Sequence, residues 1–218
     1  MSILFVLLMF LVVLTITYFR GREEPLPARV SVPLPHPQTR HELGFEIPLN
    51  YCFHPAHTWA IREGRDSARM GVDGFTANLL NKVDAVVVTA EQRWVRQGQK
   101  LLTLNSGGQT LDMLSPLEGV VTAVNSEVLK DPGLLMRDPY NAGWVCTIKS
   151  PDLETNLRNL VQGSMVASWM QNNISRLSQM VSSPNASWAQ DGGMPLRGVL
   201  AALPPEIRRK VIAEFFLT

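Results

Sequence analysis

The sequence predicts a mainly β fold, a small sandwich or barrel of short strands accompanied by a few helices. Short runs rich in apolar and β-branched residues recur between residues 58 and 148, and we expect them to be strands. The strongest is Asp84–Thr89, and Leu134–Leu135 is among the shortest. Glycine and proline separate these runs, as at Gly98 and Pro116, and such punctuation is typical of small all-β domains. A chain of 218 residues with 45% hydrophobic residues can fill such a core and still carry extensions.

The N-terminal apolar run, Ile3–Phe19, predicts a transmembrane helix, with residues 1–22 as a membrane anchor. At a rise of about 1.5 Å per residue, the run is just long enough to span a bilayer. A cleaved signal peptide is the alternative, but no basic residue precedes the run and no Ala-x-Ala site follows it. Arg20 and Arg22 follow instead, and positive residues favour the cytoplasmic side. We therefore expect a single-pass membrane protein with a cytoplasmic β-domain and its N-terminus outside.

Residues 23–50 are predicted to be a linker that separates the anchor from a β-domain at residues 51–162. Proline recurs through this stretch and favours extended, polyproline-like chain over regular helix. The prolines are Pro25, Pro27, Pro33, Pro35, Pro37 and Pro48.

Residues 163–218 are predicted to form a helical C-terminal extension. Apolar residues recur every three to four positions over Asp152–Arg176, with a break near Gly163, and again over Leu203–Phe216. A terminal apolar helix docks on its own domain or on a partner. Residues 164–218 are therefore a candidate segment for binding a protein partner.

Composition and residue spacing give little support to enzymatic, metal or nucleic-acid functions. The net charge of +1 produces no strong field for nucleic acid. Cys52 and Cys146 form neither a disulfide framework nor a zinc pattern. Cys52, His54 and His57 lie close in sequence, but no second cluster completes a coordination shell. We expect no metal, no nucleic-acid partner and no enzyme, and both thiols are expected to be ordinary and reduced.

Acidic residues are scattered along the chain and show no paired acid/base arrangement. We expect them in surface turns: Asp73, Asp84, Asp112 and Asp138.

The stretch Gly98–Gly119 predicts a β-hairpin. Leu101–Leu104 and Leu111–Leu114 can be its strands. Asn105–Gly108 (Asn-Ser-Gly-Gly) can be its turn, because asparagine and glycine tolerate positive φ. Pro116 then ends the return strand.

With its flanks, this hairpin resembles part of the H protein of the glycine cleavage system. Four motifs occur in the family's order over His57–Leu160, about half of the chain. The family's His-x-Trp is matched by His57-Thr58-Trp59, and its Val-Gly-Ile-Thr-Asp-Phe/Tyr segment resembles Met70-Gly71-Val72-Asp73-Gly74-Phe75. Its Ser-Pro-x-x-Gly-x-Val resembles Ser115-Pro116-x-x-Gly119-x-Val121. The most family-specific motif is the fourth, Asp138-Pro139-Tyr140-x-x-Gly143-Trp144.

The resemblance implies a lipoyl-like barrel-sandwich hybrid of two facing β-sheets, with short helices and a C-terminal helix. It also implies a carrier in which a lysine of a Glu-Ser-Val-Lys-Ala segment holds a lipoyl arm. Counting back from Ser115 places that lysine at Gly108, and the glutamate and serine at Asn105 and Ser106. Gln109 is the nearest alternative, but neither Gln109 nor Gly108 has an amine that could form the amide.

No lysine lies in this turn, which also contains Gly107. The lysines are Lys82, Lys100, Lys130, Lys149 and Lys210. We therefore expect no lipoyl cofactor, and a non-enzymatic, membrane-anchored H-like protein that acts as a scaffold or accessory subunit. Two alternatives stay open. One is a membrane-fusion-type transport adaptor, whose half-motifs are separated by a long α-hairpin instead of a short turn. The other is a working carrier in glycine cleavage or one-carbon transfer.

Overall fold

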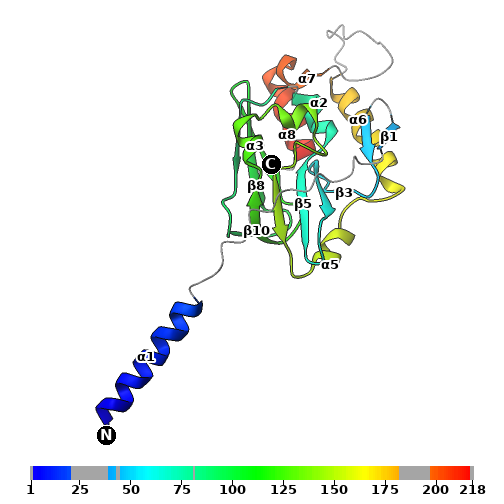
Figure 1. Cartoon of the computed structure of the whole chain (residues 1–218). Coiled ribbons are helices and arrows are strands. Elements are labelled where there is room, and N and C mark those ends of the chain that lie inside the picture. Colours follow the sequence, from blue (N-terminus) through cyan, green and yellow to red (C-terminus); the bar gives the residue numbers. More distant parts are fainter. Residues whose placement is uncertain (1, 21–38, 43–44, 81, 182–196, 217–218) are drawn as a thin grey trace. The chain divides into compact units, whose positions relative to one another are not determined.

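The computed structural model describes residues 2–20, 39–42, 45–80, 82–181 and 197–216 (Figure 1). The chain divides into two compact units, Met1–Pro35 and His36–Thr218. Residues 23–38 of the predicted linker, and residues 182–196 between the predicted C-terminal helices, lie outside the described residues.

Helix α1 (Ser2–Arg20) is the described element of the first unit. The predicted transmembrane helix is wrong: among the residues that the structure describes, no helix is both long and apolar enough to cross a membrane. With 19 residues at about 1.5 Å each, α1 is roughly 28 Å long, less than the ~30 Å of a bilayer's hydrocarbon core. The predicted location of the β-domain, which rested on that helix, stays a prediction.

The second unit contains the expected mainly β sandwich. Its larger sheet has the strand order β3-β4-β5-β11-β10-β7 and its smaller sheet the order β6-β8-β9; β1 and β2 form a separate pair. The strands are β1 (Thr39–Glu42), β2 (Phe45–Pro48), β3 (Cys52–Phe53), β4 (Thr58–Arg62), β5 (Ser67–Val72), β6 (Ala85–Val88), β7 (Trp94–Val95), β8 (Lys100–Ser106), β9 (Gln109–Leu114), β10 (Gly119–Val124) and β11 (Cys146–Lys149).

Alternation of apolar and polar residues places one face of each sheet in a common core. In β9, Leu111 and Met113 are buried, whereas Thr110 and Asp112 face outward. All the strand pairs in both sheets are antiparallel. Short turns can therefore connect neighbouring strands, as the glycine and proline punctuation predicts.

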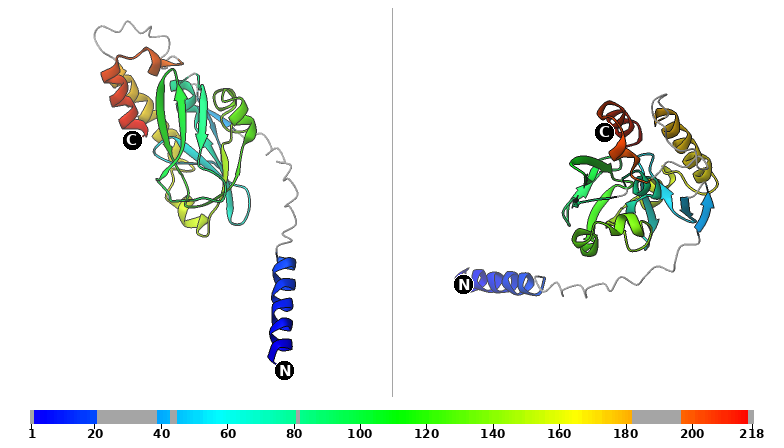
Figure 2. Two further views of the ribbon diagram at one scale, coloured as in Figure 1. Left: turned by 90° about the vertical axis from the view of Figure 1, so that its left-hand side faces the viewer. Right: turned by 90° about the horizontal axis from the view of Figure 1, so that it is seen from above.

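Short helices lie between strands, and both short and longer helices follow β11 (Figures 1 and 2). They are α2 (Gly74–Leu80), α3 (Ser126–Lys130), α4 (Leu134–Arg137), α5 (Leu153–Arg158), α6 (Met165–Val181), α7 (Val199–Ala202) and α8 (Pro205–Phe216).

Two features of these helices bear on the sequence expectations. Leu134–Leu135, expected in a strand, lie in α4, because the Asp131 carboxylate accepts the Gly133 N–H and stabilises a turn before the helix. The amphipathic pattern after residue 152 runs as α5 and α6, separated near Gly163, whose φ is +60°.

The apolar faces of the C-terminal helices pack within this unit. Helix α8 packs against α6 and β9, with Val211, Phe215 and Phe216 buried. Arg176 of α6 and Glu214 of α8 form an ion pair between the two helices. These apolar faces are therefore already occupied within the chain.

Candidate functional site

The tip of the β8–β9 hairpin is a two-residue turn. Ser106 pairs with Gln109, which leaves Gly107 and Gly108 between them. Their φ angles are +53° and +77°, the left-handed values of a type I′ turn, for which glycine is favoured. A Cβ added at either glycine would meet no atom within 4 Å. A side chain at position 108 would therefore extend into open space.

Lys82 lies beside this tip, although it is 24 residues before Ser106 in the sequence and no local pattern predicts the contact. The Ser106 hydroxyl donates to the backbone oxygen of Lys82 at 2.6 Å, and the Gly107 N–H donates to Asp84 Oδ2 at 2.8 Å. Lys82 Nζ lies 2.7 Å from Asp84 Oδ1. This hydrogen bond raises the pKa of Lys82 and lowers that of Asp84. The amine beside the turn is therefore held in its protonated form.

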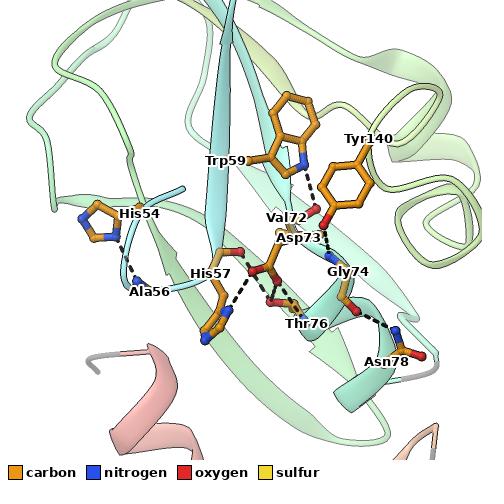
Figure 3. Close-up of polar contacts among 10 residues, drawn as sticks. All are labelled: His54, Ala56, His57, Trp59, Val72, Asp73, Gly74, Thr76, Asn78 and Tyr140. Carbon is orange, nitrogen blue, oxygen red and sulfur yellow. Dashed lines mark hydrogen bonds and ion pairs between the residues drawn. The ribbon is translucent and has the colours of Figure 1, made fainter. Parts of the chain in front are cut away.

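A second polar group, His57 with Asp73, lies inside the domain at the start of α2 (Figure 3). His57 has a φ of +63° and is fully buried, and its Nδ1 lies 2.7 Å from Asp73 Oδ2. Asp73 Oδ1 accepts hydrogen bonds from the N–H and hydroxyl of Thr76, at 2.9 and 3.1 Å. The expectation that Asp73 lies in a surface turn is wrong, because this carboxylate serves both the helix start and the imidazole.

Aromatic rings surround the His57 imidazole. Its centroid lies 4.2 Å from that of Phe75 and 5.1 Å from that of Trp169, with interplanar angles of 17° and 29°. Phe215 and Phe216 of α8 lie 5.9 and 6.1 Å away. The imidazole Nε2 is buried and has no hydrogen-bond partner among the described residues.

The structure does not join the Cys52–His57 segment into a metal site. His54 Nδ1 accepts the Ala56 N–H, and burial, followed by the charge of His57, lowers the pKa of His54 to about 4. Cys52 Sγ lies 3.5 Å from Gln162 Oε1, and burial raises the pKa of this thiol. Within the described ranges, no three His, Cys, Asp or Glu side chains gather as metal ligands.

Trp59 holds two of the sequence motifs together. Its indole N–H donates to the backbone oxygens of Val72 at 2.8 Å and Pro139 at 3.1 Å. Gly71 is paired with Trp59 across β4 and β5, and a Cβ at Gly71 would lie 2.5 Å from the indole ring. The motif glycine therefore makes room for the motif tryptophan.

Tyr140 joins the last motif to the start of α2. Its hydroxyl accepts the Gly74 N–H at 2.8 Å, and its backbone oxygen accepts the Tyr51 hydroxyl at 2.7 Å (Figure 3 shows the first). Burial raises the pKa of Tyr51 to about 12. The Tyr51 hydroxyl therefore stays a protonated donor, and the two tyrosines tie the last motif to the rest of the domain.

The rest of the last motif closes its own loop. Asp138 Oδ2 accepts the Ala142 N–H at 2.9 Å, and a Cβ at Gly143 would lie 2.6 Å from the Asp138 backbone oxygen. Half-buried Trp144 lies under the Arg69 guanidinium, whose central carbon is 4.9 Å from the ring centroid.

The Ser-Pro-x-x-Gly motif shapes the end of the hairpin. Ser115 Oγ donates to the Leu117 backbone oxygen at 2.6 Å, and the Pro116 oxygen accepts from Gln97 Nε2 at 2.9 Å. A Cβ at Gly119 would lie 2.2 Å from the Lys149 oxygen. These contacts position strands rather than reactive groups.

Residues 51–173 match the family model described as "Glycine cleavage H-protein". The "Probable glycine cleavage system H protein 2" of Sulfolobus acidocaldarius is 30% identical over 145 residues, 65% of this chain and 92% of that relative. The "Glycine cleavage system H protein" of Mycobacterium avium is 30% identical over 107 residues, 49% of this chain and 81% of that relative. A crystal structure of an H protein from Mycobacterium marinum aligns with a TM-score of 0.48 and 19% identity, covering 58% of this chain and 98% of that one.

Proposed function

Because the chain belongs to the glycine cleavage H-protein family, as its matched residues 51–173 and its Sulfolobus relative show, we propose that it is a member without a lipoyl arm. It acts without catalysis, as a scaffold or accessory subunit that binds other proteins. The observation that carries the proposal is Gly108, exposed at the tip of the hairpin with no side chain.

An acyl arm needs a primary amine at its point of attachment. Positions 107 and 108 supply only backbone, and the flanking residues Ser106 and Gln109 supply a hydroxyl and an amide. The motif residues Trp59 and Tyr140 make hydrogen bonds that stabilise the fold away from the hairpin tip. The domain can therefore keep its fold without a lysine at position 108.

A carrier with its arm on Lys82 is the second candidate, and the placement of that lysine beside the turn favours it. The side chain is 78% exposed. Against it stands the contact of Lys82 Nζ with Asp84 Oδ1 at 2.7 Å, which acylation of the amine would break. The transport-adaptor alternative needs a long α-hairpin, whereas here Gly107 and Gly108 alone join the two strands.

Enzymatic lipoylation of the purified chain tests the proposal. With a lipoate ligase, lipoate and ATP, the wild-type chain is expected to remain unmodified, and Gly108→Lys to accept lipoate. Gly98→Lys is the matched control, because Gly98 also has a φ of +77° and space around its Cβ, but lies away from the tip. Lipoylation of wild type that is lost in Lys82→Arg would establish the second candidate and contradict the first.

A further inference from the structure

We draw no further inference here: the strongest candidate, the exposed surface patch of Arg93, Trp94 and Arg96 on the edge strand β7, carries nothing, because nothing in the structure shows what covers it.

Discussion

Removing the Asp73 carboxylate should destabilise the domain through two separate losses. Asp73→Ala deletes the acceptor for the Thr76 N–H at the start of α2, a loss of about 1 kcal/mol for a helix N-cap. It also leaves His57 Nδ1 without its partner in a site where both side chains are 0% exposed, which costs about 1–3 kcal/mol. Because both side chains are fully buried, the two losses add, and the total is about 2–4 kcal/mol.

Urea unfolding followed by tryptophan fluorescence measures this change directly. For a unit of this size, such a loss corresponds to a fall in Tm of roughly 4–16 °C. The control is Asp112→Ala, which removes an ion pair with Lys100. Because the Asp112 side chain is 33% exposed, this substitution should lower the free energy of unfolding by less than about 1 kcal/mol. If Asp73→Ala cost no more than Asp112→Ala, the buried His57–Asp73 pair would not stabilise the fold.

Three further outcomes are expected. Gly71→Ala should cost about 1–3 kcal/mol in urea unfolding, because the new Cβ would lie 2.5 Å from the Trp59 ring. Since the folded-state pKa of His54 is lowered from 6.5 to about 4, its contribution to stability is complete above pH 6.5 and is lost as the pH falls towards 4. Wild type should therefore lose roughly 2–3 kcal/mol between pH 7 and 4.5 that His54→Asn does not lose in the same titration. Burial raises the pKa of both Cys52 and Cys146, so a thiol reagent at pH 7.5 should label them slowly in the native chain and rapidly in urea.

The sequence was informative where the signal was local. Alternating apolar residues on either side of the Gly107–Gly108 pair predicted the hairpin, because a two-residue turn requires that backbone. The three-to-four-residue spacing over Leu203–Phe216 likewise predicted a helix, and α8 lies at Pro205–Phe216. The short run Leu134–Leu135 was misread, since two residues cannot reveal a period.

The polar contacts of the site could not be predicted from local sequence patterns, because they join residues far apart in the chain. His57 and Asp73 are 16 residues apart and meet because β4 pairs with β5. Lys82 reaches the hairpin tip through hydrogen bonds to Ser106 and Asp84, the first of which spans 24 residues. Spacing along the chain gives no signal for either contact. The length of the apolar run at residues 3–19 also led to the wrong prediction that this helix crosses a membrane.

Intact-mass spectrometry of the chain purified from its native cells shows whether this protein carries a lipoyl arm. The hairpin with Gly108 at its tip is expected to carry no acyl group, and the whole polypeptide to show no lipoyl increment. A lipoyl adduct on any lysine, Lys82 included, would contradict this expectation.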